Sequence, residues 1–356
     1  MAPLDWGLGH STRCIPIIRE LQNQNCEVLI AAEGATQVLL RSEFLNARFL
    51  PLRGYRIRYS KHPFLKFWVI VQLPRILMNS WRENRWLEKI IKDHQIDAVI
   101  SDNRFGLYNN KITSIYITHQ LKIITGNSFT EKIARSIHHY IIGKFNICWV
   151  PDQEKNGLAG ELSHPSIVPR NVRYIGPLSR FERISGLQKK FDLLVMLSGP
   201  EPQRTILEKM ILDDLKSIKG TVLLVRGLPG CKKNISDGGE SVTIVNHLSA
   251  AELNLAMQQS YITVSRSGYT TIMDLVKLSQ KAILIATPGQ TEQEYLARYL
   301  HEKKIFMSAE QNNFSLCNSL SDLQNEDLRF PIMDMEHYKS VVNEFVESLN
   351  TTTTPT

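Results

Sequence analysis

Short runs of apolar, often β-branched residues alternate along the chain with longer stretches of helical spacing. The apolar runs occupy 27–32, 47–52, 97–102, 114–119 and 146–152, and later 191–199, 221–227, 241–246, 261–268, 281–289 and 304–309. Runs that are apolar on both faces are typical of parallel strands covered by helices on both sides. We therefore predict an α/β protein built from doubly wound parallel sheets.

The pattern starts again near Phe191, which predicts two Rossmann-like domains facing across a cleft. We expect domains at 1–180 and 191–335, a polar linker at 181–190, a C-terminal helix at 336–349 and a disordered, Thr-rich tail at 350–356. Only the segment MAPL precedes the first turn, so we expect the first strand to be very short or truncated.

Composition narrows the choice of partners. The net charge of +7 suits phosphate-bearing substrates, an anionic membrane or nucleic acid. The chain has no block of Lys and Arg and no aromatic RNA-binding signature, so nucleic acid is not expected. The five cysteines have no metal-binding spacing, and no apolar stretch reaches the ~18 residues of a membrane span. We expect a cytoplasmic protein without a bound metal.

The first turn, DWGLGHSTR, is a candidate site. Gly7 and Gly9 allow tight backbone conformations, and Ser11 is a good helix-capping residue, so the turn suits an acceptor or a phosphate group. His10 is a candidate catalytic base because its ordinary pKa of about 6.5 suits proton transfer. Asp102, at the end of a predicted strand, is the other candidate base. The first turn and the segment around Asp102 are also compatible with ordinary turns that have no catalytic role.

In the second half, SRSGYTTIMD joins a predicted strand to a helix. Ser267, Gly268 and Thr270 would place donors for a diphosphate at the helix start, and Arg266 would add a cation. Asp274 lies one turn beyond Thr270 and would bind ribose hydroxyls. Alternatively, the segment is an ordinary helix cap, and Asp274 is an acidic residue that faces the solvent.

The segment TPGQTEQE is a candidate sugar site. Gln290, Glu292 and Gln293 crowd a predicted helix start, and amide and carboxylate groups suit hydroxyls that both donate and accept. A solvated helix N-terminus would also favour the acidic residues.

Two further strand ends carry candidate donor-binding residues. Ser198 and Gly199 form a glycine turn that suits phosphate, and Arg204 is a possible cation near it. His247 and Leu248 follow another strand, where the backbone would pair with a nucleobase edge. Simple loop chemistry would also explain these residues.

The stretch 55–86 mixes basic and apolar residues. It would lie on an anionic bilayer that carries a lipid-linked acceptor, or form a buried helix pair with charged ends. In both cases we expect Pro74 to interrupt it.

These motifs, in this order over most of the chain, resemble the GT-B glycosyltransferases of family 28, the closest type being the N-acetylglucosaminyltransferase of the lipid-linked peptidoglycan precursor. The resemblance implies a donor on the second domain and an acceptor on the first. It assigns the diphosphate contacts to Ser267 and Gly268 and the ribose contact to Asp274. It assigns the donor-sugar contacts to Glu292 and Gln293, and the uracil contacts to His247 and Leu248. Two positions depart from the family: its sugar-site asparagine is Leu296 here, and its ribose acid is Asp instead of Glu.

The resemblance implies transfer of a sugar from a nucleotide donor, expected to be UDP-linked, to an acceptor hydroxyl on a lipid-linked molecule or a glycan. No cofactor besides this co-substrate is expected, and the enzyme would be peripheral on the inner membrane face. The start GLGHSTRC also resembles nucleotide-sugar hydrolases of the pseudaminic acid pathway. A hydrolase, an epimerase of the same fold and a non-catalytic nucleotide-sugar binder stay open as alternatives.

Overall fold

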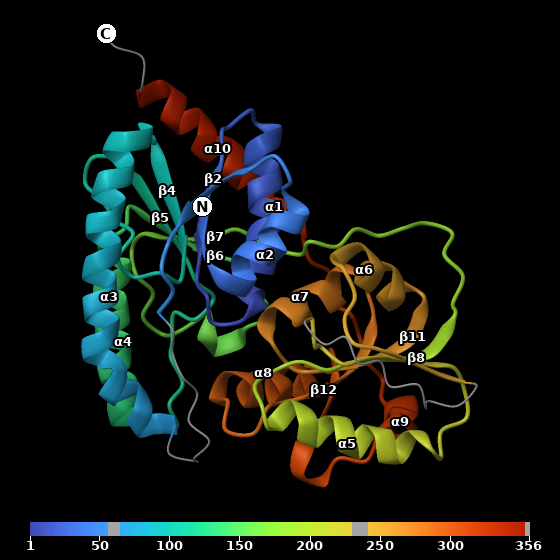
Figure 1. Cartoon of the computed structure of the whole chain (residues 1–356). Helices are drawn as coiled ribbons and strands as arrows, with labels where there is room; N and C mark the ends of the chain where they lie inside the picture. Colours follow the sequence, from blue (N-terminus) through green and yellow to red (C-terminus); the bar gives the residue numbers. More distant parts are fainter. Residues whose placement is uncertain (56–64, 230–240, 353–356) are drawn as a thin grey trace. The chain divides into compact units, whose positions relative to one another are not determined.

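The computed structural model describes residues 1–55, 65–229 and 241–352. The chain forms two compact units (Figure 1). The first unit contains Met1–Arg180 together with Met333–Thr356, and the second unit is Phe181–Ile332. The C-terminal segment therefore returns to the first unit, which the sequence did not indicate.

The first unit is built on a parallel sheet with the strand order β1-β4-β5-β6-β7. Its strands are β1 (Ala2–Pro3), β4 (Ala98–Asp102), β5 (Thr113–Ile117), β6 (Ile147–Val150) and β7 (Val172–Tyr174). A parallel pair, β2 (Leu29–Ala32) and β3 (Arg48–Pro51), extends the sheet beyond β1. The Met1 ammonium donates to the Leu29 carbonyl at 2.9 Å, and the Ala31 N–H donates to the Met1 carbonyl at 2.9 Å. The strand order therefore reverses between β1 and β4, which is the usual binding position in such sheets.

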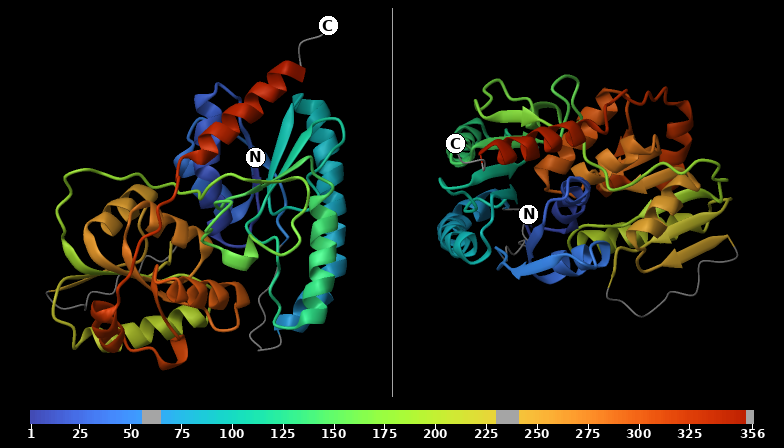
Figure 2. Two further views of the ribbon diagram at one scale, coloured as in Figure 1. Left: turned by 180° about the vertical axis from the view of Figure 1, so that it is seen from behind. Right: turned by 90° about the horizontal axis from the view of Figure 1, so that it is seen from above.

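Helices cover both faces of this sheet (Figure 2). They are α1 (Leu8–Asn23), α2 (Gly34–Glu43), α3 (Leu65–His94), α4 (Ser128–Ile142), the 3-10 helix η1 (Gly160–Leu162) and α10 (His337–Thr352). Helix α3 runs through Pro74, so the expected interruption there is wrong. A proline removes one backbone donor, and the remaining hydrogen bonds of a long helix hold on either side of it.

Helix α10 packs against α1 and buries Val341, Val342 and Phe345. The ring of Phe345 meets Trp149 of β6 edge-on, with the centroids 5.6 Å apart. The helix reaches Thr352, beyond the expected end at residue 349, and residues 353–356 of the expected tail lie outside the described residues.

The second unit is a parallel sheet with the strand order β10-β9-β8-β11-β12-β13. Its strands are β8 (Phe191–Met196), β9 (Val222–Val225), β10 (Val242–Val245), β11 (Ser260–Ser265), β12 (Lys281–Ile285) and β13 (Met307–Ala309). Its helices are α5 (Gln203–Leu215), α6 (Ala250–Gln258), α7 (Tyr269–Lys277), α8 (Thr291–Glu302), η2 (Gln311–Asn313) and α9 (Leu316–Asn325). The order reverses between β8 and β11, so the carboxyl ends of these two strands mark the binding position of this unit.

These observations confirm the α/β fold class with parallel sheets. Every predicted apolar run overlaps a strand, whereas β7 was not predicted. Its sequence, VRY, is three residues long, half-buried and carries a charge in the middle, so it lacks the continuous apolar signal of the other strands. The cleft expected between the domains stays a prediction.

Candidate functional site

The first unit brings His10 and Asp102 together where its strand order reverses. His10 lies in the first turn of α1, directly after β1, and Asp102 is the last residue of β4. The His10 Nδ1 atom lies 2.8 Å from Asp102 Oδ1. Arg13 Nη2, which can only donate, lies 2.9 Å from the same Nδ1 atom. The tautomer with the proton on Nδ1 donates to the carboxylate. This tautomer leaves Nε2 as the basic nitrogen of the ring.

Asp102 is fully buried and held by its neighbours as a carboxylate. Arg13 donates from Nε to Oδ2 at 2.5 Å and from Nη2 to Oδ1, and the Cys14 thiol donates to Oδ2 at 3.4 Å. Burial alone would raise the pKa of Asp102, but Arg13 and His10 outweigh it and hold that pKa well below its ordinary value. Asp102 is therefore ionised at neutral pH.

His10 is held as a neutral ring. Its side chain is 16% exposed, so part of the ring is accessible while Asp102 is not. Burial and the nearby Arg13 guanidinium lower the pKa of His10 below 6.5, although Asp102 acts in the opposite direction. A neutral histidine oriented by a buried carboxylate is the arrangement of a general base.

The residues predicted around this turn have different surroundings. Gly7 has φ = 90° and precedes α1 without a side-chain cap. It lines a cavity of about 530 Å³ with Asp5, Leu8, Glu33, Gly34, Ala35 and Thr36. Gly9 is exposed, whereas the Ser11 hydroxyl is buried and donates to Thr36 Oγ1 at 3.0 Å. Ser11 therefore holds α1 against α2 instead of facing a ligand.

In the second unit, two buried donors lie unpaired beside the Gly199 turn. Arg266 follows β11 and Thr287 follows β12, and each is 2% exposed. Arg266 Nε and Thr287 Oγ1 have no hydrogen-bond partner. A Cβ atom on Gly199 would lie 3.9 Å from Arg266 Nε and 3.5 Å from Thr287 Oγ1. The space beside Gly199 is therefore the space that both donors face.

The rest of the Arg266 guanidinium is fixed by backbone carbonyls. It donates to Ala286 at 3.1 Å and to Gln203 at 3.0 Å. Burial lowers the pKa of Arg266 to about 10, so it stays a cation at neutral pH. Because buried donors usually have a partner, we take the unpaired Arg266 nitrogen and the unpaired Thr287 hydroxyl near Gly199 as a candidate anion site.

The predicted diphosphate turn lies next to these donors in the sheet. Gly268 precedes α7 without a side-chain cap, and a Cβ atom there would meet nothing within 4 Å. Ser267 is buried and donates to the Gln293 carbonyl at 2.8 Å, so its side chain holds the turn to α8. Thr270 is half-buried, and Asp274 is buried on α7.

The predicted sugar segment forms its own hydrogen-bonded loop. Gln293 accepts from the Thr287 N–H at 2.9 Å and donates to Gln290 Oε1 at 2.6 Å. Gln293 therefore fixes the backbone that carries the unpaired Thr287 hydroxyl. Glu292 is half-buried in the same turn, and Leu296 belongs to the core.

Arg204 is already engaged and does not serve as a second free cation. It donates from Nε to Glu201 at 2.6 Å and from Nη1 to Glu208 at 3.1 Å. Arg226 donates to the same Glu208 at 2.5 Å and to Asn246 Oδ1 at 2.9 Å. This network joins α5 to the ends of β9 and β10, so Arg204 supports the loop that follows β10.

That loop contains the residues predicted to meet a nucleobase. His247 is exposed and Leu248 is half-buried. Ser249 then caps α6, accepting from the Glu252 N–H while Glu252 accepts from the Ser249 N–H. Ser198 and Gly199 are also exposed, with Gly199 at φ = 100°.

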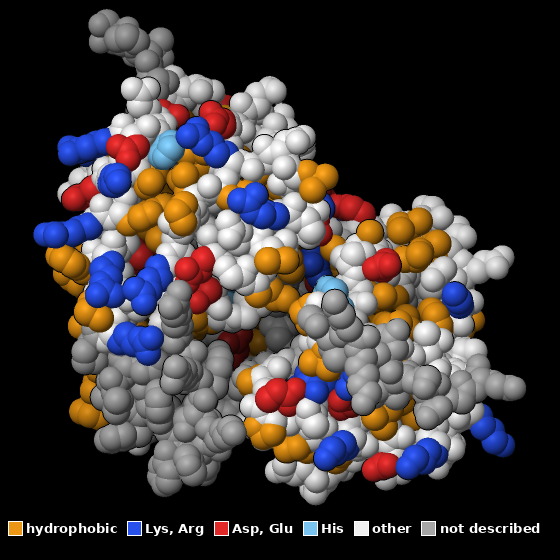
Figure 3. Space-filling view, viewed as in Figure 1, with side chains coloured by type: hydrophobic (Ala, Val, Ile, Leu, Met, Phe, Trp, Pro, Cys, Tyr) orange, Lys and Arg blue, Asp and Glu red, His pale blue; other side chains and the backbone are white. Residues whose placement is uncertain are grey.

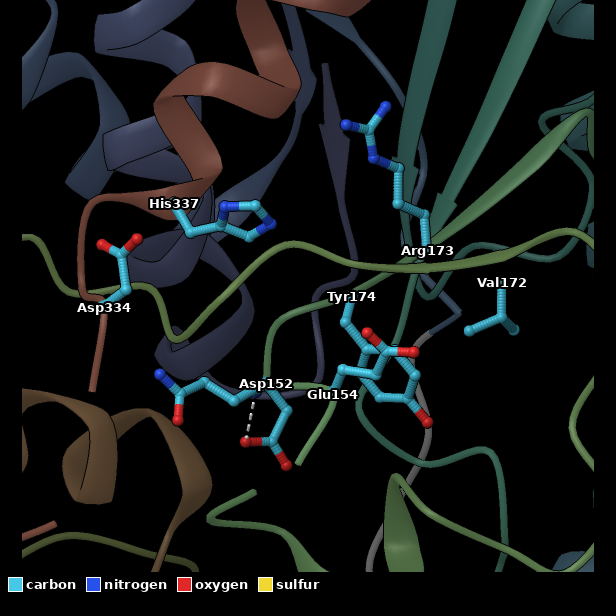
Figure 4. Close-up of a pocket in the computed structure, with 8 residues that line it drawn as sticks. Asp152, Glu154, Val172, Arg173, Tyr174, Asp334 and His337 are labelled. Carbon is cyan, nitrogen blue, oxygen red and sulfur yellow. Dashed lines mark hydrogen bonds between the residues drawn. The ribbon is translucent and has the colours of Figure 1, made fainter. Parts of the chain in front are cut away.

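A second cavity of the first unit, of about 480 Å³, has no counterpart among the predicted sites (Figure 4). It is lined by Asp152, Gln153, Glu154, Val172, Arg173, Tyr174, Asp334 and His337. Asp152 accepts from the N–H groups of Gln153, Leu158 and Ala159, so its buried carboxylate is satisfied by the protein itself. Within 1–55, 65–229 and 241–352, no group of three or more His, Cys, Asp or Glu side chains is placed to hold a metal ion.

Comparison with known proteins gives one domain match and a shared fold. Residues 229–349 match the model of the glycosyltransferase family 28 C-terminal domain. No curated protein matches the chain. Among solved structures, the chain is similar to the glycotransferase of kitacinnamycin, with 13% identity, a TM-score of 0.66 and coverage of 98% of both chains.

Two further solved structures share the fold. The spinosyn rhamnosyltransferase SpnG complexed with thymidine diphosphate is 10% identical over 98% of this chain and 95% of its own, with a TM-score of 0.62. MurG of Acinetobacter baumannii is 12% identical over 99% and 93%, with a TM-score of 0.53. The chain thus has the GT-B fold, and residues 229–349 match a glycosyltransferase family 28 C-terminal domain.

Proposed function

We propose that the protein transfers a sugar from a UDP-linked donor to an acceptor hydroxyl. The observation that carries the proposal is the pair of buried, unpaired donors, Arg266 Nε and Thr287 Oγ1, beside the Gly199 turn. They lie at the carboxyl ends of the central strands β8, β11 and β12, where doubly wound sheets bind nucleotides.

In this proposal the second unit binds the nucleoside diphosphate. Arg266, Thr287 and the uncapped N-terminus of α7 neutralise the charge that develops as the bond between the anomeric carbon and the β-phosphate oxygen breaks. Glu292 contacts the donor sugar, Asp274 the ribose, and the loop with His247 and Leu248 the base. Preorganised protein donors then supply the stabilisation, without a metal ion. The spinosyn enzyme of the same fold, crystallised with thymidine diphosphate, is consistent with this class of ligand.

The first unit supplies the base. His10 Nε2 takes the proton of the acceptor hydroxyl, the oxygen forms the new bond to the anomeric carbon, and the nucleoside diphosphate leaves. Asp102 stabilises the imidazolium that results, because it is a fixed carboxylate at 2.8 Å from Nδ1.

A combined binding and turnover assay tests the proposal. UDP should raise the melting temperature more than GDP, ADP or dTDP. UDP-N-acetylglucosamine and other UDP-hexoses are then incubated with soluble glycans or a polyprenyl diphosphate-linked glycan in vesicles. Release of UDP only when an acceptor is present supports transfer. Free sugar without acceptor would show a hydrolase, interconverted donor an epimerase, and binding without turnover a nucleotide-sugar binder.

We also propose that the protein works at an anionic membrane, on the cytoplasmic side. The candidate surface, here called the α3–α4 face, consists of Leu77, Met78 and Trp81 on α3 and of Phe129, Ile133, Ile137 and Tyr140 on α4, all exposed. The two helices lie on the same flank of the sheet in both figures (Figures 1 and 2). No helix in the described part of the chain is long and apolar enough to cross a membrane.

The charge around this face fits an anionic surface. Exposed basic residues accompany both helices: Arg75, Arg82, Arg85, Lys89, Lys132 and Lys144. Lys and Arg side chains gather over α3 in the space-filling view (Figure 3). Each contributes about 1 kcal/mol near an anionic bilayer, in addition to burial of the apolar row in the interface. Residues 56–64 of the predicted membrane segment lie outside the described residues, and α4 extends the surface beyond that segment.

A further inference from the structure

Arg13 is a buried cation that neither the sequence motifs nor the proposed chemistry explains. It is 2% exposed and lies three residues after His10, so both side chains project from the same side of α1. Its guanidinium contacts Asp102 through two nitrogens, Nη2 lies 2.9 Å from His10 Nδ1, and Nη1 lies 3.0 Å from His119 Nδ1. Arg13 therefore joins α1 to the ends of β4 and β5.

We propose that Arg13 is a positioning residue that keeps His10 neutral and correctly oriented, so that its Nε2 can act as the base. This inference rests on the proposed role of His10. An isolated buried carboxylate beside a histidine favours the imidazolium, which cannot take a proton. Here the carboxylate is already paired with Arg13, and the cation itself opposes a second positive charge on His10.

The groups that surround His10 come from three elements. Arg13 and Cys14 belong to α1, Asp102 ends β4, and His119 follows β5. Arg13 and Asp102 balance each other, and His119 adds no negative charge. The pKa of His10 is accordingly lowered, by burial first and by Arg13 second, against the opposing effect of Asp102.

Arg13 also decides the orientation of a second ring. An arginine only donates, so the contact at 3.0 Å makes His119 Nδ1 an acceptor and places its ring proton on Nε2. Arg13 Nη2 also lies 2.9 Å from His10 Nδ1, and His10 donates to Asp102 only in the tautomer with its proton on Nδ1. The Nε and Nη2 groups of Arg13 hold both oxygens of Asp102 in place, which fixes the plane of the carboxylate that His10 Nδ1 contacts.

Two substitutions separate the charge of Arg13 from its geometry. Arg13→Gln removes the charge but keeps a donor for Asp102. Arg13→Lys keeps the charge but loses the planar set of N–H donors that the guanidinium provides. Arg19→Gln is the matched control, since Arg19 is on the same helix and pairs with Glu43 at 2.8 Å. The acid limb of the pH profile of kcat/KM should move up by about one unit or more in Arg13→Gln. It should not move in Arg13→Lys, whose kcat falls, or in Arg19→Gln.

Nitrogen NMR of the histidine rings gives a readout that does not depend on turnover. In the unmodified protein, His10 should be neutral at pH 6.5 with its proton on Nδ1, and it should titrate at higher pH in Arg13→Gln. An unmoved His10 titration in a folded Arg13→Gln variant would overturn the inference. If that variant does not fold, a His10 of the unmodified protein that is charged at pH 6.5, or protonated on Nε2 alone, would overturn it. If UDP binding or turnover fails while the titration shifts as expected, the proposed function is wrong and the placement of Arg13 stands.

Discussion

His10 and Asp102 are 92 positions apart in the sequence, yet His10 Nδ1 lies 2.8 Å from Asp102 Oδ1. The contact arises because β1 and β4 are neighbours in the parallel sheet, with Pro3 paired to Asp102. The helix that follows β1 begins at the carboxyl end of β4. Because the strand order reverses between β1 and β4, the His10 ring and the Asp102 carboxylate meet at the carboxyl ends of these two strands.

Replacing His10 by Ala tests the base. Without it, the acceptor hydroxyl has no positioned group to take its proton, so kcat should fall by about 10²- to 10⁴-fold. Binding of UDP, measured by calorimetry, should be unchanged because the second unit holds the nucleotide. His94→Ala, at the end of α3, should leave both quantities unaltered. Equal rates in the two variants would remove His10 from the mechanism.

The pH profile of the unmodified protein follows from the neutral state of His10. Its pKa is below 6.5, and a base works only when it is unprotonated. Activity should therefore persist as the pH falls through 6.5 and decline only at lower pH, with the single-proton slope of one group. An acid limb of kcat/KM at or above pH 6.5 would contradict this assignment.

Asp102→Asn tests the buried ion pair. The pKa of Asp102 is lower in the folded protein, so the pair stabilises the fold above pH 3.8 and this contribution is lost as the pH falls below that value. Removing the charge leaves Arg13 buried without its partner, which costs about 3 kcal/mol. At pH 7 the melting temperature of the first unit should fall by about 6 °C or more. Asp97→Asn, an exposed change just before β4, is the control and should shift it by no more than about 2 °C.

Vesicle sedimentation tests the α3–α4 face. The double variant Phe129→Ser, Tyr140→Ser removes the two most exposed large hydrophobic side chains of α4, each worth about 1.5 kcal/mol if buried in a bilayer. Binding to phosphatidylglycerol vesicles at low salt should weaken by at least about tenfold. The control, Ile206→Ser with Tyr261→Ser, alters exposed apolar residues of the second unit. No binding by the unmodified protein, or equal loss in both doubles, would refute membrane docking through this face.

The sequence predicted the strands well because most are continuous apolar runs, and it singled out His10, Asp102 and Arg266 because each lies at or after the end of a strand. It did not identify Arg13 or Thr287. The spacing of three residues between His10 and Arg13 was a usable signal, since it places both on one side of a helix. Thr287 had no comparable signal, because its importance depends on an unpaired hydroxyl that only the packing around it reveals.

Arg204 was predicted as a cation for the donor, and that role stays a prediction. The structure pairs its guanidinium with Glu201 and Glu208 on the same segment. Spacings of three and four residues, available in the sequence, were sufficient to predict these pairs. The return of α10 to the first unit depends on long-range packing against α1, which no local pattern encodes.

Calorimetric titration of UDP into Thr287→Val and Thr263→Val tests the central claim most directly. Both threonines are buried and both have an unpaired hydroxyl, but Thr263 lies inside β11 and Thr287 lies beside the Gly199 turn. We predict that Thr287→Val weakens UDP binding by about tenfold, the loss of roughly one hydrogen bond to a charged group, while Thr263→Val leaves it unchanged. Equal UDP affinity in the two variants would contradict the account.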